Sequence, residues 1–216
     1  QGRDLFQQGE SQDADRCQKR IPSVAVGLSM SISVEISAFD GIENQWAEFL
    51  PSSVTNNIFV TPWWQRVWWN NFGQDSKLWI HSVREGDSVL GVAPLMERAG
   101  VVTFVGEKDL SDYFDFLAIE GSEEDFYSAL CSHLVDSDID WRCLDLPSLR
   151  EDSPTLKYLP ALAEDRGLKV HIEKETTTPV AQLPNAWEEY IAGLRRKDRH
   201  ELRRKLRRLE GADGHH

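Results

Sequence analysis

The chain has 216 residues, and its 40% of hydrophobic and 28% of charged residues exclude a fibrous or wholly disordered protein. Its three cysteines, Cys17, Cys131 and Cys143, are widely spaced without a CxxC pair, which argues against a disulfide framework and a metal site. The net charge of −12 opposes nucleic acid as a partner, and without a secretory signal or an apolar run long enough to span a membrane we expect a cytoplasmic protein.

Periodicity and end signals predict the first strands and helices. Residues 31–39 alternate apolar with polar side chains, which is typical of a half-buried strand. Asp40 is the expected N-cap of the helix that follows. Residues 61–73 predict a second, tryptophan-rich helix that begins with Thr-Pro and ends with Gly. The Glu-Gly-Asp turn at 85–87 then predicts a hairpin.

The chain up to residue 173 continues with strands and helices. Further strands are predicted at 77–83, 88–96, 101–105, 114–119, 141–146 and 168–173, and further helices at 123–135 and 153–166. Hairpins followed by β-α-β units indicate an α/β (α+β) fold in which a mixed sheet carries helices on its faces.

Three regions follow from these patterns. Residues 1–30 are polar and lack periodicity, so we expect a disordered leader. Residues 31–183 are expected to form the α/β domain, and residues 184–216 a basic linker of one or two helices. Asp198 falls on the apolar stripe of this linker, and a helix break near residues 196–199 would move its charge out of the core.

Positive charge is concentrated near the C-terminal end. Residues 195–210 hold nine of the 24 Lys/Arg residues but three of the 36 Asp/Glu residues, so this segment carries +6 and the remainder −18. The segment could recognise phosphates on a nucleotide-sugar or a lipid-linked pyrophosphate. It could also bind nucleic acid, which the acidic remainder opposes. A solvated face between two domains is the commonest role of such a charge run.

A polar turn is the first candidate site. Ser111, Asp112 and Tyr113, together with Asp109 and Asp115, offer three carboxylates and a phenol just before a predicted strand. Such a cluster could grip a substrate hydroxyl or amine, or transfer a proton. The structural alternative is a polar turn with phenylalanines packed behind it.

Two groups of aromatic residues also have structural and functional interpretations. Four tryptophans gather in the helix at 61–73, namely Trp63, Trp64, Trp68 and Trp69. Their indole rings could stack on a sugar, but large aromatic residues more often form core, so we expect at most two of them to be exposed. Four histidines show no ligand or nucleophile pattern and receive no catalytic role, namely His81, His133, His171 and His200.

Five phrases follow one another along most of the chain. They are Thr-Pro-Trp-Trp at 61–64 with Trp-Trp-Asn-Asn-Phe-Gly at 68–73, Gly-Val-Ala-Pro-Leu at 91–95, Ser-Asp-Tyr at 111–113, the strand at 141–146, and Lys-Asp-Arg-His-Glu-Leu-Arg-Arg-Lys at 197–205. In this order they resemble the GNAT-type acyltransferases of the CelD/BcsL group, whose shared region is also called a BioF2-like acetyltransferase domain. The basic segment also resembles the more distant Fem-type transferases.

The resemblance implies a mixed, mostly antiparallel sheet with helices on both faces, and two such halves side by side in the intact protein. In that family the second half carries the groove for acyl-CoA. A glycine-spaced turn that could hold a pyrophosphate at a helix N-terminus is missing from this sequence. We therefore expect the N-terminal half of the enzyme, inactive alone and without a cofactor of its own, with a C-terminal GNAT domain as its partner.

The implied activity of the intact protein is transfer of an acyl group from acyl-CoA to an amine on a sugar, polysaccharide or cell-envelope precursor. The amine would attack the thioester directly. The expected acceptor contacts are Asp109, Asp112, Tyr113, Trp63, Arg199 and Arg203. The alternative function is a non-catalytic binding or assembly module that uses the Trp-rich and basic helices, and a homodimer through the apolar face of the last helix is a further expectation.

Overall fold

The computed structural model describes residues 6–7, 31–138 and 140–212. The chain divides into two compact units, Gln1–Lys174 and Glu175–His216, and each is described by itself. The sequence placed this division later, at 183–184. Within the expected disordered leader, Phe6–Gln7 form strand β1, which the sequence did not predict, and the rest of residues 1–30 lies outside the described residues.

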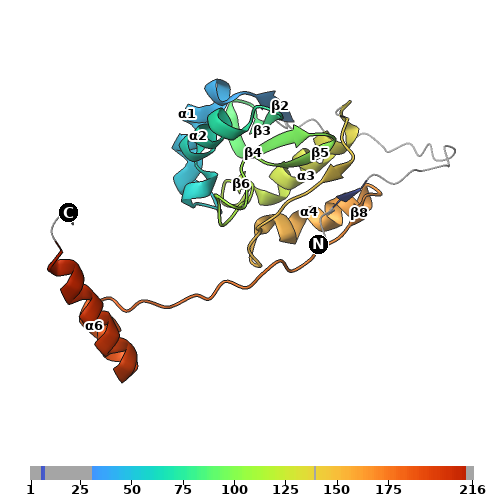
Figure 1. The fold of residues 1–216 in the computed structure, drawn as a ribbon. Helices are drawn as coiled ribbons and strands as arrows, with labels where there is room; N and C mark the ends of the chain where they lie inside the picture. The colour runs from blue at the N-terminus through green and yellow to red at the C-terminus, as the bar shows by residue number, and fades with distance from the viewer. Residues whose placement is uncertain (1–5, 8–30, 139, 213–216) are drawn as a thin grey trace. The chain divides into compact units, whose positions relative to one another are not determined.

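The described part of the first unit contains one sheet of eight strands (Figure 1). Along the sheet the order is β2 (Ile32–Ser37), β3 (Lys77–Glu85), β4 (Ser88–Arg98), β5 (Val101–Phe104), β7 (Cys143–Leu144), β1 and β8 (Lys169–Val170), and β6 (Leu117–Ala118) pairs with β4. β5 and β7 are parallel, whereas the other pairs are antiparallel. The expected mixed, mostly antiparallel sheet is therefore present.

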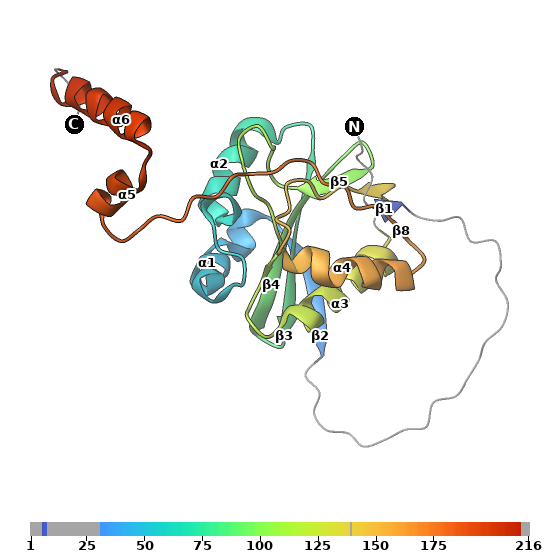
Figure 2. The same cartoon turned by 90° about the horizontal axis from the view of Figure 1, so that it is seen from below.

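Helices cover both faces of this sheet, as Figures 1 and 2 show. They are α1 (Phe39–Phe49), α2 (Pro62–Phe72), α3 (Glu123–Asp136) and α4 (Pro154–Asp165), with short 3-10 helices at Leu50–Ser52 and Ile58–Val60. α1 and α2 pack on one face, and α3 and α4 pack on the other. The α/β (α+β) prediction is confirmed.

Each face of the sheet has its own hydrophobic core, because alternate residues of a strand point to opposite sides. On the side of α1 and α2, Trp46 and Trp68 pack in one cluster with Ile80 of β3. On the side of α3 and α4, Phe104 of β5 packs in a second cluster with Phe116. Burial on both faces explains why the sequence of β4 is a nearly continuous apolar run rather than an alternating one.

The helix ends follow the sequence signals with one exception. The side-chain oxygen of Thr61 caps α2 by accepting a hydrogen bond from the backbone N–H of Trp64 at 3.4 Å. The prediction for Asp40 is wrong, because α1 begins at Phe39 with Ala38 as its N-cap. The buried ring of Phe39 stacks with that of Trp46 at a centroid distance of 6.3 Å. Core packing thus places Phe39 inside the helix.

Three predicted strands are shorter than expected, namely those at 114–119, 141–146 and 168–173, where β6, β7 and β8 have two residues each. Part of the reason is that the flanking backbone bonds to other segments. The N–H of Phe114, for example, donates to the carbonyl of Ser148 at 3.3 Å. The residues on either side of these short strands therefore lie in loops. Hydrogen bonds such as that between Phe114 and Ser148 connect loops that are far apart in the sequence.

The described part of the second unit contains two helices, α5 (Trp187–Gly193) and α6 (Arg196–Glu210). The predicted helix break occurs at the extended residue Leu194, slightly before the expected 196–199. Asp198 lies in the first turn of α6, with its Oδ2 2.9 Å from Nε of Arg195. The break therefore gives Asp198 a cationic partner at a helix N-terminus, where negative charge is favourable.

Candidate functional site

Two loops leave the sheet at the same edge. β5 and β7 are parallel, with Val101 opposite Cys143, so their carboxyl ends point the same way. The loop after β5 covers residues 105–116 and includes the predicted turn at 111–113, and the loop after β7 covers residues 145–153. In α/β sheets, ligands bind outside the carboxyl ends of parallel strands. This edge is therefore the best place in the first unit for a site.

Direct contacts join these two loops. Besides the hydrogen bond between Phe114 and Ser148, the guanidinium of Arg150 lies over the ring of Tyr113, 5.7 Å from the ring centroid. A guanidinium is attracted by the negative face of an aromatic ring. Tyr113, which the sequence predicted as an acceptor contact, thus has a cation beside it that the sequence did not single out.

The first turn of α2 also contacts the turn at 111–113. Nε1 of Trp64 donates a hydrogen bond to the buried hydroxyl of Ser111 at 3.2 Å, and the Trp64 ring meets Phe59 edge-on with centroids 5.3 Å apart. The preceding residue, Trp63, is 52% exposed. We call the following residues the loop site: Trp63, Trp64, Ser111, Asp112, Tyr113 and Arg150.

Arg150 is held in place by a carboxylate from its own loop. Its Nε and Nη2 donate to the two oxygens of Asp152 at 2.8 and 3.0 Å. These hydrogen bonds raise the pKa of Arg150 and lower the pKa of Asp152. Two contacts therefore hold the orientation of the Arg150 guanidinium: Asp152 at its Nε and Nη2 edge, and the Tyr113 ring beside it.

The backbone at this edge adopts conformations that few residues tolerate. Ser148 has φ 57°, in the left-handed region that is costly for a residue with a side chain. Gly106, just after β5, has φ 141°, and a Cβ at this position would lie 2.4 Å from Cε1 of Phe114. Strained positions cluster at functional sites in proteins, and both of these belong to the two loops of the loop site.

Asp115 belongs to a buried hydrogen-bond network rather than to an exposed carboxylate cluster. Its carboxylate accepts hydrogen bonds from the N–H of Phe116 at 2.9 Å and from the hydroxyl of Thr155 at the start of α4. Oγ1 of Thr155 is also 2.9 Å from the hydroxyl of Tyr127 in α3. Burial raises the pKa of the Asp115 carboxyl, and the hydrogen bonds oppose this rise. Asp115 therefore ties the loop after β5 to α4 and is not available as a third ligand-binding carboxylate.

The other predicted contacts have different positions. Asp109 and Asp112 are exposed in the loop after β5. Arg199 and Arg203 belong to α6 in the second unit, whereas the loop site belongs to the first unit. Nη2 of Arg199 donates to the carbonyl of Leu194 at 3.0 Å, whereas Arg203 is exposed.

The four tryptophans of α2 divide between core and surface as expected. Trp68 is buried, Trp64 and Trp69 are partly buried, and Trp63 is exposed. The prediction that at most two would be exposed is confirmed. Because Trp63 is the exposed member, it alone among the four presents a large open indole surface for stacking.

Sequence reasoning missed Arg150 and the Trp64–Ser111 bond. These contacts join residues 37 and 47 positions apart, and no local pattern marks such pairs. One local feature could have drawn attention to Arg150. It stands two residues before Asp152, an oppositely charged residue, and just before the helix cap Ser153, and such a pair can hold the end of a loop in place.

Comparison with known proteins leaves the family open: no family model matches the chain, and neither a curated protein nor a solved structure matches it. The resemblance to GNAT-type acyltransferases therefore stays a prediction. Within the described residues, no helix is both long and apolar enough to cross a membrane. In the same part of the chain, no three His, Cys, Asp or Glu side chains are grouped as metal ligands would be.

Proposed function

We propose that this chain is the acceptor-binding, N-terminal half of a GNAT-type N-acyltransferase acting on an amine of a saccharide or cell-envelope precursor. One observation carries the proposal: the Trp64–Ser111 hydrogen bond and the Arg150–Tyr113 contact join three separate segments at the carboxyl ends of the parallel strands. Next to these contacts in the chain, Trp63 and Asp112 are exposed. Protein sites for sugars combine aromatic faces for stacking with charged groups that hydrogen-bond hydroxyls and amines. The mixed sheet with helices on both faces also supports the resemblance.

Within this proposal each exposed side chain has a distinct role. The carboxylate of Asp112 accepts a hydrogen bond from the acceptor amine or a neighbouring hydroxyl, and Asp109 adds negative charge nearby. Tyr113 offers its hydroxyl, while Arg150 fixes the position of the ring. Trp63 offers an open indole face for a sugar ring. Arg199 and Arg203 remain expected contacts for phosphates of the precursor.

The acyl-CoA donor, which supplies the acyl group as a thioester, does not fit the helix that would be the natural place for its phosphates. Gly121, with φ 88°, and Ser122 precede α3, and helix N-termini of this kind often bind phosphate. The first turn of α3, however, contains Glu123, Glu124 and Asp125. Three carboxylates repel a pyrophosphate, which supports a donor site in a partner domain. We assign no step of the transfer to this chain and place the intact enzyme in the cytoplasm.

A second candidate is a non-catalytic binding module that uses α2 and α6. The observation in its favour is that both helices present side chains suited to contact, the indole of Trp63 and the exposed arginines of α6. The two candidates differ in the ligand. A binding module needs a partner surface, whereas an acceptor half binds a small amino sugar at the loop site.

The test is to titrate the full chain with glucosamine, N-acetylglucosamine and acetyl-CoA. Calorimetry measures the affinity, and changes in amide chemical shifts show which residues are involved. We expect glucosamine to shift the amides of residues 109–113 and 148–152. Asp112→Asn should weaken binding at least roughly tenfold, since a hydrogen bond to a charged group contributes about 1.5 to 3 kcal/mol. Asp165→Asn, an exposed aspartate at the end of α4, is the matched control and should bind as the wild type does.

Two results would contradict the proposal. If acetyl-CoA binds this chain with micromolar affinity, the assignment of the donor to a partner domain is wrong. If glucosamine leaves the loop-site amides unchanged, or binds Asp112→Asn as tightly as the wild type, the loop site is not the acceptor site. A chain that ignores all three compounds but captures a purified partner domain through α2 would favour the binding module.

A further inference from the structure

The second unit has a strongly basic helix whose acids are largely neutralised within it. Asp198 pairs with Arg195, and Glu201 pairs with Arg204, with 2.6 Å between Oε1 and Nη2. Nζ of Lys205 is also 4.0 Å from Oε1 of Glu201. The remaining exposed cations of α6 are Arg196, Lys197, Arg203, Arg207 and Arg208. Because these side chains project from a helix of 15 residues, the second unit presents a dense positive surface to solvent.

The same unit exposes apolar side chains to an unusual degree. Ile191 is its single buried residue among those described. Leu183 is 73% exposed and Trp187 is 53% exposed, although both are large and apolar. A unit with so little core cannot cover these groups by itself, so an external apolar phase would stabilise it.

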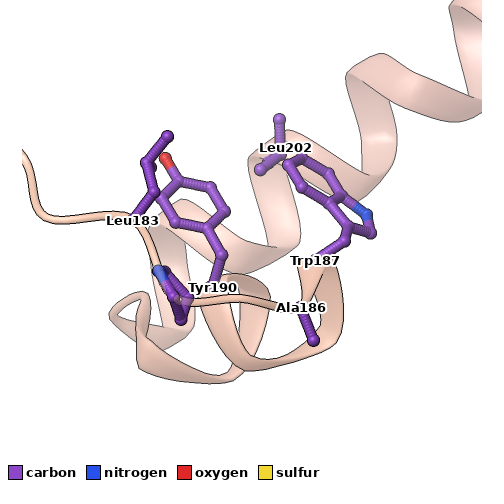
Figure 3. Close-up of a pocket in the computed structure, with 6 residues that line it drawn as sticks. Leu183, Ala186, Trp187, Tyr190 and Leu202 are labelled. Atoms are coloured by element: carbon purple, nitrogen blue, oxygen red, sulfur yellow. The ribbon is translucent and has the colours of Figure 1, made fainter.

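These apolar groups surround a pocket of about 410 Å³ (Figure 3). It is lined by Leu183, Pro184, Ala186, Trp187, Tyr190 and Leu202, all from the second unit. The rings of Trp187 and Tyr190 stack with centroids 5.4 Å apart. The pocket is therefore an apolar space with two aromatic side chains whose polar atoms can face water.

Two cations of α6 flank Leu202, the residue that this helix contributes to the pocket. Arg199 and Lys205 stand three residues before and three residues after Leu202, a spacing that puts side chains on the same side of a helix. Leu206 and Leu209 continue the apolar stripe of Leu202. An apolar face that includes Trp and Leu, flanked by Lys and Arg, is the composition of helices that lie in the interface of a lipid bilayer.

We propose that the α5–α6 unit docks on the surface of an anionic phospholipid membrane. The cations of α6 neutralise lipid phosphates, while Leu183 and Trp187 enter the boundary between headgroups and acyl chains and the pocket takes an acyl-chain segment. The docking is peripheral, in keeping with the lack of a spanning helix among the described residues. It does not depend on the acyl transfer proposed above.

The apolar pocket favours a membrane over RNA as the anionic partner. RNA would satisfy the arginines through its phosphates, and its bases stack on exposed aromatic faces. It offers nothing, however, to fill a space lined by Leu183, Ala186 and Leu202. A bilayer supplies both parts, negative charge at its surface and hydrocarbon just below it.

The test is flotation of the full chain with vesicles of phosphatidylcholine alone or mixed with phosphatidylglycerol. We expect binding that requires the anionic lipid and weakens with salt. Arg203→Gln with Lys205→Gln, two exposed positions on either side of Leu202 around the axis of α6, should lower the partition coefficient at least roughly tenfold, because each cation near an anionic surface contributes roughly a fivefold factor. Lys169→Gln with Lys174→Gln removes the same charge from the first unit and should bind as the wild type does.

A second variant tests the apolar part. Leu183→Ser changes a side chain outside both helices, so the helices should be retained, and it should weaken vesicle binding at least threefold. Failure to float with anionic vesicles at low salt would overturn the proposal. So would equal binding to single-stranded RNA and vesicles with Leu183→Ser unaffected in both, because that result would show a charged helix with a preference for any polyanion.

Discussion

The two units differ in how much of their apolar surface they bury. The first unit places a core on each side of its sheet, with Trp46, Phe116 and Tyr127 fully buried. The second unit buries one described residue, Ile191. Hydrophobic burial is the main favourable term in folding. The first unit buries enough apolar surface to stabilise its own fold. The second unit keeps both charge and apolar surface exposed, which is what the proposed membrane docking requires.

The largest effect should come from removing a core tryptophan of the first unit. Trp46→Ala deletes a fully buried indole between α1 and the sheet, and we expect a loss of about 3 to 5 kcal/mol in the free energy of unfolding. Denaturant unfolding followed by circular dichroism measures this loss. Trp63→Ala, at a half-exposed position of α2, is the control and should cost less than about 1 kcal/mol. Similar losses in the two variants would contradict the described core.

Buried histidine gives the first unit a pH dependence. His81 in β3 is fully buried, its Nδ1 lies 3.0 Å from the carbonyl oxygen of Trp79, and its ring is 5.4 Å from that of His133. Burial and the neighbouring His133 lower the pKa of His81 from 6.5 to about 4. Between these values the unfolded chain binds the proton more readily. The free energy of unfolding should therefore fall as the pH drops from about 6.5 to about 4, by up to about 3 kcal/mol, and then level off.

Unfolding curves at a series of pH values measure this effect. His81→Leu should have a smaller loss of stability over the same pH range, because the group that takes up the proton is gone. His171→Gln, an exposed histidine after β8, is the control and should keep the dependence of the wild type. If His81→Leu retained the whole pH dependence, other groups would be responsible.

The smallest effect is expected in the second unit. Ile191→Ala removes its one buried side chain among the described residues and should lower the local opening free energy of α5 and α6 by no more than about 2 kcal/mol. Hydrogen exchange of the amides at 187–210 measures this change. Leu209→Ala, at an exposed position of α6, should leave exchange unchanged. A loss for Ile191→Ala as large as that for Trp46→Ala would remove the contrast between the units.

Local signals predicted most of the helices and the central strands. Thr61 with Pro62 marks the start of α2, and Gly86 with φ 57° makes the hairpin turn between β3 and β4. Such features depend on neighbours in the sequence, so they can be inferred from it. The start of α1 could not, because Phe39 is drawn into the helix by a contact with Trp46 in the core.

The pairing of strand β1 and the contacts of the loop site were harder to predict, because both depend on residues far apart in the sequence. β1 pairs with both β7 and β8, with Phe6 opposite Leu144 and Val170, and no pattern in two residues indicates so distant a partner. The sequence singled out Asp112 and Tyr113 as candidates because polar residues before a strand are conspicuous. Arg150 was not, because its role depends on a contact across the two loops.

The parallel pairing of β5 with β7 also sets an order of events in folding. β3, β4 and β5 follow one another directly, so their pairing closes short loops and should form early. Pairing of Val101 with Cys143 must wait until about 40 intervening residues, α3 included, are gathered in, and this closure costs more chain entropy. The loops that carry Tyr113 and Arg150 become neighbours only at that stage. Binding of the proposed acceptor at the loop site should therefore appear late in refolding, after the antiparallel part of the sheet has formed.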